Sequence, residues 1–443
     1  MSERPWSGRR LHFVGIGGAG MSGWARAAAE LGATVSGTDR ADSPALERLR
    51  ALGIDARAGH GAGNVPAGDD VEVVVSTAVP PGNPERVAAA ERGLRVMPRA
   101  ELLGELTALR RVIAVAGAHG KTTTTSMAAH VLLGAGLDPG YLIGGELRTT
   151  GTNAAWGSGE WLVVEADESD RSMLALHVDV AVLTNVELDH HATFGSLAEL
   201  EADVRTFLAG APLAVIWDRP ELLALRSGPV VAYEARDVAL AGGGSRFTWR
   251  GREVVLAVPG LHNARNAVAA LEAAALAGAG EDAAVTAIAT FRGAGRRFER
   301  LGESASGALV VDDYAHHPTE VAATIDAART LGRPGRVWAV FQPHLFSRTE
   351  RLAREFGAAL ARADAIAVLD VYPAREHAED FPGVTGRLVA EAAADAAGGR
   401  PVYWLPGFAD AERVLAPRLG PGDVALVLGA GDVDRLGRAL VEP

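Results

Sequence analysis

Short apolar runs alternate with alanine-rich stretches along the whole chain, and this alternation constrains the fold more than any other feature of the sequence. Runs such as LHFVGI at 11–16, VEVVVS at 71–76 and RVIAVAG at 111–117 are typical of strands buried on both faces. The pattern continues through WLVVEAD, VDVAVLTNV, ALVVDDY, VWAVFQPH, AIAVLDVY and DVALVLGAG. Since strands of this kind alternate with helices of amphipathic spacing, the sequence predicts parallel sheets covered by helices, which is an α/β fold.

The chain has 443 residues, too many for one hydrophobic core, and ordinary domain sizes predict about three domains. A glycine-rich turn at 15–20, a phosphate loop at 117–122 and a new βαβ series from about residue 308 divide the chain. We therefore expect a Rossmann-like domain at 1–108, a central domain of the P-loop type at 109–297, and a Rossmann-like α/β domain at 298–443. Alternating residues around SRFTWRGREVVLAV, between 228 and 259, predict a small antiparallel sheet beside the central parallel sheet.

Charge and composition exclude several classes of function. The formal net charge of −12 argues against a general nucleic-acid binder, which needs a basic surface. The absence of cysteine excludes disulfides, thiolate metal ligands and a cysteine nucleophile. No apolar run approaches the roughly 20 residues of a membrane span, and no signal peptide is evident, so we expect a cytoplasmic protein without membrane contact.

A first glycine-rich loop follows the first apolar run. Gly15, Gly17 and Gly20 match G-x-G-x-x-G, and Asp39 ends the next predicted strand, at the spacing found in dinucleotide-binding folds. Glycines there let backbone N–H groups approach a diphosphate at a helix N-terminus. The geometry suits NAD(P) and the UDP of a sugar nucleotide equally, so the loop predicts a pyrophosphate without identifying it.

A second loop, GAHGKT at 117–122, lies between a predicted strand and a predicted helix. Its Lys121 is the single lysine of the chain. A compact ammonium with three donors binds phosphate in a way that a guanidinium does not reproduce. Val115 stands where the full Walker pattern has glycine, but the strand, loop and helix context still predicts ATP binding, with the Thr122 hydroxyl near Mg²⁺.

Acidic and histidine residues follow two further predicted strands. WLVVEAD ends in carboxylates that continue just beyond it, at Glu165, Asp167, Glu168 and Asp170, and TNVELDHH supplies Asn185, Asp189, His190 and His191. Since α/β sheets place ligands at the carboxyl ends of strands, these residues predict an oxygen-rich site for Mg²⁺. Zinc is disfavoured because cysteine and HExxH spacing are both absent.

Polar clusters recur in the second half of the chain. They are His262, Asn263 and Asn266 in PGLHNARN, Arg296 and Arg297 in GAGRRF, Asp312, Asp313, Tyr314, His316 and His317 in DDYAHHP, and His344 and Arg348 in FQPHLFSRT. An N-terminal cap explains one of the two asparagines but not both. Each of the two arginines is compatible with an ordinary surface position and with a contact to a phosphate.

Taken together, GIGGAGMSG, GAHGKTTTT, EADESD, TNVELDHH, PGLHNARN, GAGRRF, DDYAHHP and FQPHLFSRT resemble, in order and over essentially the whole chain, the motifs of the Mur ligase family. The resemblance is greatest to the family's alanine-adding branch. It implies ATP-dependent ligation of L-alanine to the carboxylate of UDP-N-acetylmuramate through an acyl phosphate, in a monomer or weak homodimer.

The resemblance also assigns roles by position. It implies UDP-sugar contacts at Gly15, Gly17, Gly18, Gly20, Met21, Asp39, Ser76 and His119, and ATP contacts at Gly117, Ala118, His119, Gly120, Lys121, Thr122, Thr123, Asn263, Asn266, Arg297 and Asp313. It places Mg²⁺ at Thr122, Glu165 and His190, and catalytic roles at Lys121, Glu165, His190, Arg297, Asp313, His344 and Arg348. Arg375 is a weaker candidate for the amino-acid side. Ala118 replaces the family's usual threonine, and the carbamylated lysine of several sister ligases has no counterpart here.

Three alternatives remain open on the sequence. A tripeptide-adding recycling ligase of the same family has similar motifs, although GIGGAGMSG favours the alanine-adding branch. An NAD-dependent oxidoreductase would explain the first glycine loop and leave the second nucleotide loop unexplained. A non-catalytic nucleotide-binding regulator would bind ATP without amino-acid-dependent phosphate release.

Overall fold

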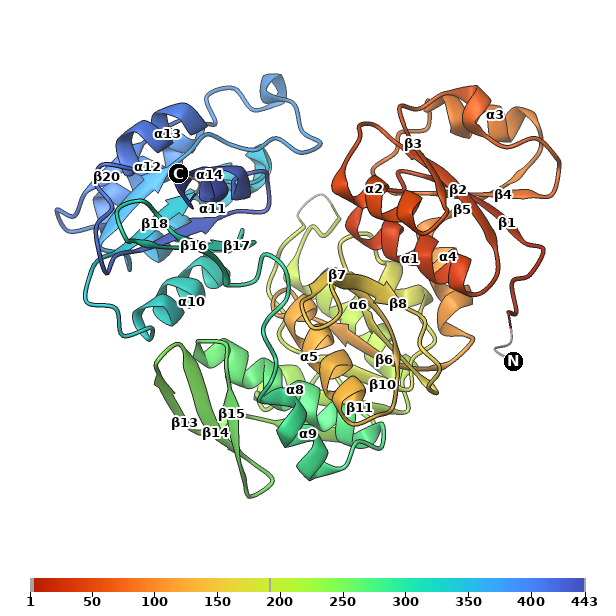
Figure 1. The fold of residues 1–443 in the computed structure, drawn as a ribbon, viewed down its shortest axis with the longest axis horizontal. Helices are drawn as coiled ribbons and strands as arrows, with labels where there is room; N and C mark the ends of the chain where they lie inside the picture. Colours follow the sequence, from red (N-terminus) through yellow and green to blue (C-terminus); the bar gives the residue numbers. More distant parts are fainter. Residues whose placement is uncertain (1–3, 191–192, 442–443) are drawn as a thin grey trace. The chain divides into compact units, whose positions relative to one another are not determined.

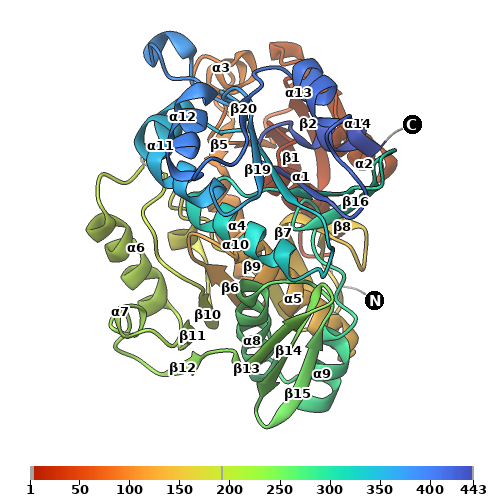
Figure 2. The same ribbon diagram turned by 90° about the vertical axis from the view of Figure 1, so that its left-hand side faces the viewer.

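Four β-sheets with flanking helices make up the part of the chain that this computed structural model describes, residues 4–190 and 193–441 (Figures 1 and 2). The predicted α/β class is confirmed, because three of the sheets are wholly or mostly parallel and carry helices between their strands.

The first sheet is five-stranded and parallel, in the order β3-β2-β1-β4-β5. Its strands are β1 (Arg10–Val14), β2 (Thr34–Asp39), β3 (Asp55–Ala58), β4 (Val71–Val75) and β5 (Arg95–Pro98). Its helices are α1 (Ala19–Glu30), α2 (Pro44–Ala51), α3 (Pro84–Glu91) and α4 (Arg99–Thr107), with a 3-10 turn η1 (Ala62–Asn64). The central strand β1 is buried along nearly its whole length, as its unbroken apolar run predicts.

The second sheet has seven strands in the order β12-β11-β10-β6-β9-β7-β8. They are β6 (Arg111–Ala116), β7 (Gly140–Leu147), β8 (Thr152–Ala155), β9 (Trp161–Glu165), β10 (Val180–Leu183), β11 (Leu213–Trp217) and β12 (Val230–Tyr233). The helices that follow in sequence are α5 (Lys121–Gly134), η2 (Ser172–Ala175), α6 (Leu197–Gly210), α7 (Pro220–Leu223), α8 (Leu261–Leu276) and α9 (Glu281–Ile288). Helix α5 packs on β6, β7 and β9.

A three-stranded antiparallel sheet follows, as predicted for this stretch, and Figure 2 shows its strands side by side. Its strands are β13 (Arg236–Ala241), β14 (Gly244–Trp249) and β15 (Arg252–Leu256).

The last sheet has the order β16-β17-β21-β18-β19-β20. Its elements are β16 (Glu299–Glu303), β17 (Leu309–Asp313), α10 (Pro318–Arg329), β18 (Val337–Phe341), α11 (Phe346–Leu360), β19 (Ala365–Val368), η3 (Ala378–Asp380), α12 (Gly386–Ala396), β20 (Val402–Trp404), α13 (Phe408–Leu415), β21 (Val424–Leu428) and α14 (Asp434–Val441).

Two edge strands depart from the parallel pattern. Strand β8 pairs antiparallel with β7, and β16 pairs antiparallel with β17. Only a short turn separates β7 from β8, and a parallel partner would need a crossover of a dozen residues or more. Both β8 and β16 are mainly half-buried or exposed, so neither carries the apolar run from which the strands were predicted.

Local sequence signals set several helix starts. Helices α2, α3 and α10 each have proline in the first turn, preceded by Ser43, Asn83 and His317 as N-caps whose side chains accept backbone N–H bonds. Proline loses no hydrogen bond at this position, and the cap satisfies a donor that the helix leaves unpaired.

Successive core residues of a strand alternate between the two faces of its sheet. In β17 and β18, Leu309, Val311 and Phe341 lie in the apolar cluster on one face of the last sheet, and Val310 and Trp338 lie in the cluster on the other face. Burial on both faces is what the continuous apolar runs predict.

By density of contacts the chain forms two compact units, Met1–Glu234 with Asn266–Ile288, and Ala235–Arg265 with Ala289–Pro443. The first unit holds the first predicted domain and most of the second, whereas 235–265 and 289–297 of the predicted central domain belong to the other unit. The domain limits 1–108, 109–297 and 298–443 stay a prediction. Across the described residues, no helix combines the length and the hydropathy needed to cross a membrane.

Candidate active site

The phosphate loop joins β6 to α5 and depends on two glycines with positive φ. Gly117 has φ +134°, and a Cβ there would overlap Thr184 Oγ1. Gly120 has φ +81°, and a Cβ there would lie 2.7 Å from Asn266 Oδ1. An L side chain is strained at such angles and also lacks space here. The loop therefore packs against Thr184 and Asn266, which brings the predicted ATP residue Asn266 beside it.

Residues after β10 fasten this loop through the backbone of His119. Asn185 Oδ1 accepts a bond from His119 N (2.9 Å), while Asn185 Nδ2 (2.9 Å) and Thr184 Oγ1 (2.6 Å) donate to His119 O. The His119 ring contacts Glu187, with Nε2 3.2 Å from Oε2. Thr184 and Asn185, 65 and 66 residues further along the chain than His119, thus hold the loop in its conformation, a role that was not predicted for either residue.

Lys121 begins α5 and folds back over the loop. Its Nζ donates to Gly117 O at 2.7 Å and to Glu168 Oε1 at 2.8 Å. Burial by itself would lower the pKa of Lys121, but the carboxylates of Glu168, Asp167 and Glu165 outweigh this and raise the pKa. The ammonium is therefore charged at neutral pH.

The carboxylates that follow β9 have separate partners. Glu165 Oε2 accepts from Thr122 Oγ1 at 3.2 Å, and its Oε1 accepts from Gly144 N at 2.6 Å. Asp167 Oδ2 lies 2.9 Å from Arg99 NH2, and Asp170 accepts from Arg99 Nε. The structure thus brings together Thr122 and Glu165, two of the three predicted magnesium ligands.

Glu168 is 4% exposed; the sequence placed it in the predicted oxygen-rich cluster but gave it no individual role. Its Oε1 accepts from Lys121 and lies 3.4 Å from His190 Nε2. Burial would raise the pKa of Glu168, but Lys121 and His190 more than offset this and lower it. Among the described residues, its buried Oε2 has no hydrogen-bond partner.

His190, the third predicted magnesium ligand, has φ +53° and lies beside Glu168 and, at 3.9 Å, Asp189. A positive φ is uncommon outside glycine and marks a backbone held by its surroundings. The neighbouring His191, part of the same predicted cluster, lies outside the described residues.

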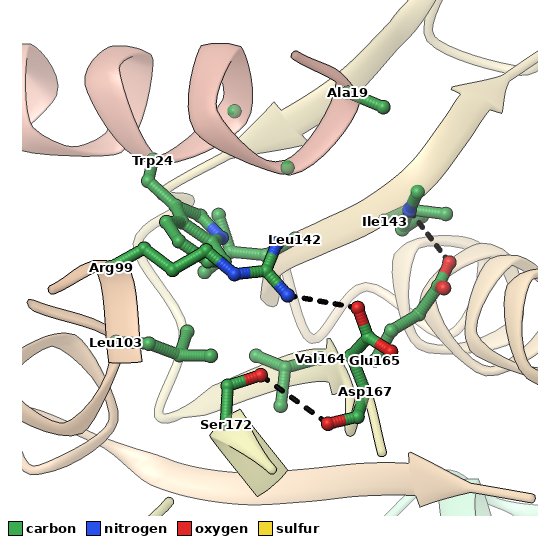
Figure 3. Close-up of a pocket in the computed structure, with 13 residues that line it drawn as sticks. Ala19, Trp24, Arg99, Leu103, Leu142, Ile143, Val164, Glu165, Asp167 and Ser172 are labelled. Carbon is green, nitrogen blue, oxygen red and sulfur yellow. Dashed lines mark hydrogen bonds and ion pairs between the residues drawn. The ribbon is translucent and has the colours of Figure 1, made fainter. Parts of the chain in front are cut away.

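A cavity of about 270 Å³ adjoins this acidic edge (Figure 3). It is lined from α1 by Gly20 and Trp24, and from the second sheet by Gly144, Glu165 and Asp167. Arg99, at the start of α4, reaches Asp167 beside the cavity, with its guanidinium 5.3 Å from the Trp24 ring centroid. No motif in the sequence had singled out Arg99.

The first glycine loop forms the turn expected from its fingerprint. Gly15 has φ +85°, and Gly17 N donates to Asp39 Oδ2 at 2.8 Å. A Cβ at Gly15 would lie 3.0 Å from that of Ser76. Gly18 caps α1, and Gly20 and Met21 belong to its first turn. The structure therefore gathers the predicted UDP-sugar residues of the first sheet at the carboxyl ends of β1, β2 and β4.

Other predicted residues belong to the second compact unit. Asn263 Nδ2 donates to Pro259 O at 2.7 Å, which ties the first turn of α8 to the segment before it. Arg297 lies over the Tyr314 ring, 5.1 Å from its centroid, and 3.8 Å from Glu320. Arg296 instead donates to Asp312 and to the carbonyls of Gly429 and Gly431, so it fastens strand ends.

Asp313 is 8% exposed and accepts from Phe298 N (2.7 Å) and Ala315 N (2.8 Å). Burial raises the pKa of Asp313 to about 6, against the opposing effect of Arg297.

His344 and Arg348 lie together after β18. Arg348 is 3% exposed, with NH1 3.2 Å from His344 Nδ1, and the His344 ring stacks on Tyr372. Arg375 is exposed. The roles of the predicted residues in this unit toward ATP and the amino acid stay predictions.

Models of the Mur ligase family match three successive parts of the chain: the catalytic domain at residues 10–111, the middle domain at 115–274 and the glutamate ligase domain at 296–431. The chain is 44% identical to a UDP-N-acetylmuramate–L-alanine ligase of Rubrobacter xylanophilus, over 98% of this chain and 99% of that one. It is 46% identical to one of Acidithiobacillus ferrooxidans, over 97% and 96%.

Among solved structures, the UDP-N-acetylmuramate-alanine ligase of Thermotoga maritima aligns over 97% of this chain and 98% of its own, with a TM-score of 0.83 and 27% identity. A murein peptide ligase of Psychrobacter arcticus aligns over 98% of each chain, with a TM-score of 0.71 and 25% identity. The phosphate loop, the acidic strand end beside it and these full-length likenesses lead to one conclusion: the chain belongs to the Mur ligase family.

Proposed function

We propose that this protein is an ATP-dependent ligase that joins L-alanine to the carboxylate of UDP-N-acetylmuramate, giving ADP and phosphate, in the synthesis of peptidoglycan precursors. One observation carries the proposal: the partly buried Lys121 of a phosphate loop lies against the acidic end of β9, in a chain whose relatives of that name match it over nearly their whole length. We place the protein in the cytoplasm, as a monomer or weak homodimer with no nucleic-acid or membrane partner.

In the first half-reaction, a carboxylate oxygen of the sugar nucleotide attacks the γ-phosphorus of ATP, the bond to the β-phosphate oxygen breaks, and ADP leaves. Catalysis of phosphoryl transfer consists mainly of positioning and charge neutralisation. The Lys121 ammonium, the backbone N–H groups of the loop and the N-terminus of α5 supply both.

The residues at the acidic edge fit Mg²⁺. Thr122 Oγ1 and Glu165 Oε2 are 3.2 Å apart, and the neighbouring Glu168 Oε2 is a buried oxygen without a partner among the described residues. Hard oxygen donors with one imidazole suit this ion. Thr122, Glu165 and His190 would hold it, and it would supply positive charge to the nucleotide phosphates.

In the second half-reaction, the alanine nitrogen attacks the acyl carbon and phosphate departs. A base must take the proton that the amine loses, and His190 and His344 are the candidates for this role. An acyl phosphate hydrolyses in water, so the site must exclude solvent while the intermediate exists.

A tripeptide acceptor is not favoured, because the murein peptide ligase matches this chain with a lower TM-score than the alanine ligase does. An NAD-dependent oxidoreductase is not favoured, because it gives the Lys121 loop no function.

The test is phosphate release from ATP and Mg²⁺ by the purified chain, with UDP-N-acetylmuramate and each of L-alanine, glycine, L-serine and the tripeptide in turn. We expect release that requires both the sugar nucleotide and L-alanine, with a product heavier than the sugar nucleotide by one alanine residue. Release with the tripeptide alone would select the recycling ligase. No release with any acceptor would reject the ligase.

A further inference from the structure

Glu168 differs from the other carboxylates after β9 in what it contacts. Glu165 bonds to Thr122 and Gly144, and Asp167 and Asp170 bind Arg99. Glu168 accepts from the Lys121 ammonium at 2.8 Å and, on the same Oε1, lies 3.4 Å from His190 Nε2. One carboxylate oxygen therefore joins the phosphate-loop lysine to the histidine after β10.

The second oxygen of Glu168 is not used in this arrangement. The side chain is 4% exposed, and Oε2 is buried without a hydrogen-bond partner among the described residues. A buried carboxylate oxygen without a donor is costly. The protein therefore tolerates this cost at a position where an incoming donor or cation could relieve it.

The Lys121 contacts also bear on nucleotide binding. With Nζ on Gly117 O and Glu168 Oε1, the ammonium is drawn back over the loop. A phosphate that binds the loop has to compete with Glu168 for this ammonium, since both are anions that seek the same donors. Glu168 thus disfavours nucleotide binding while it keeps the ammonium in place.

We propose that Glu168 is a positioning residue of the ligase, which holds Lys121 and His190 on one carboxylate and gives up Lys121 to the nucleotide phosphates when they bind. The proposal rests on the ligase function proposed above. After the exchange, the Glu168 carboxylate remains beside His190 and keeps that imidazole oriented. Glu168 acts through these two residues and need not touch the reacting atoms.

The exchange predicts that nucleotide affinity and turnover change in opposite directions. In Glu168→Gln, the amide attracts the ammonium less than a carboxylate does and does not repel phosphate. ADP should therefore bind more tightly in the presence of EDTA, by about fivefold or more, whereas kcat should fall about tenfold or more because Lys121 and His190 lose their common anchor. A residue with a merely structural role would lower both.

The experiment uses the full chain, with ADP and ATP titrated calorimetrically in EDTA and kcat measured with Mg²⁺. Glu201→Gln is the matched control: it makes the same change of charge on α6, where Glu201 pairs with Arg205 one turn further along, and both readouts should stay unchanged. Glu168→Asp keeps the negative charge but shortens the side chain by one methylene. Compared with Glu168→Gln, it should have a higher kcat and a smaller change in ADP affinity.

Tighter ADP binding with lower kcat in Glu168→Gln supports the proposal. Unchanged or weaker ADP binding, or an unchanged kcat, overturns it. If the glutamine variant does not fold, Glu168→Asp decides, and nucleotide affinity equal to that of the unaltered protein overturns the exchange. Wild-type protein without alanine-dependent phosphate release would reject the ligase function instead, while the ADP titrations would still test the exchange.

Discussion

Burial favours the protonated form of every carboxylate, and the charged partners of each one decide whether its pKa ends above or below the usual value. Asp167 and Glu168 lie beside Lys121, and although burial opposes it, this cation lowers the pKa of both. Asp313 accepts two backbone bonds and has Arg297 nearby, yet burial outweighs these effects and raises its pKa to about 6. Glu168 contacts the ammonium directly, and Asp167 is stabilised by the charges of Lys121 and Arg99, so both stay charged, whereas Asp313 has a pKa of about 6.

Asp313 predicts a dependence of stability on pH. Its folded-state pKa lies above the unfolded value near 4, so the folded state binds more protons between pH 4 and 6. The free energy of unfolding should therefore fall as pH rises through this window, by about 2 to 3 kcal/mol from this group. Asp313→Asn should remove that part of the slope, measured by urea unfolding between pH 4 and 7.

Asp326→Asn serves as the control, because this exposed carboxylate pairs with Arg362 at the surface. It should leave the slope as in the unaltered chain. Stability curves of Asp313→Asn and the unaltered protein that run parallel over the whole range would contradict the raised pKa of Asp313.

At the scale of elements, the strand, loop and helix unit β6–α5 depends on glycine at both ends. Gly117 has φ +134° and no space for a side chain, whereas Gly136, just beyond the last turn of α5, has φ +77° and open space around it. The two positions separate the conformational requirement for glycine from the steric one.

Gly136→Ala should lower the free energy of unfolding by about 1 kcal/mol, because alanine disfavours the left-handed conformation and meets no clash there. Gly117→Ala should cost at least about 2 kcal/mol more, because the added methyl overlaps Thr184, and it should abolish ATP binding as the loop moves. Denaturant unfolding and ATP titration measure the two effects. Equal losses in the two variants would show that Thr184 does not confine the loop.

The structure also shows which elements the sequence pattern could reveal. Strands β1, β6 and β17 carry continuous apolar runs because both of their faces are buried, and they were predicted. Strands β8 and β16 lie at sheet edges and have few buried side chains. Their pairing depends on a neighbouring strand, so their own residues carry little signal.

At the scale of the whole molecule, the two predicted nucleotide sites belong to different sheets. Gly15, Gly17 and Asp39 lie at the end of the first sheet, and Lys121 lies at the end of β6 in the second. Lys121→Ala should therefore abolish phosphate release while UDP-N-acetylmuramate affinity stays within about twofold, measured by calorimetry.

Lys121→Ala also leaves the buried Glu168 carboxylate without the ammonium that it binds, and this loss by itself destabilises the fold. The double variant Lys121→Ala/Glu168→Gln removes the unpaired charge and separates loss of folding from loss of chemistry. It should melt at a higher temperature than Lys121→Ala and remain inactive. A folded double variant that fails to bind the sugar nucleotide would contradict the separation of the two sites.

The sequence by itself determined the α/β class, the two glycine loops, the single lysine and the order of the family's motifs, because apolar period, turn residues and phosphate chemistry are local properties. The tertiary structure decided the rest. It selected Glu168 from a run of acidic residues as the partner of Lys121, made Thr184 and Asn185 the supports of the loop, and brought Arg99 to Asp167. These contacts join residues from different strands and helices, and such pairings are set only when sheets and helices pack together.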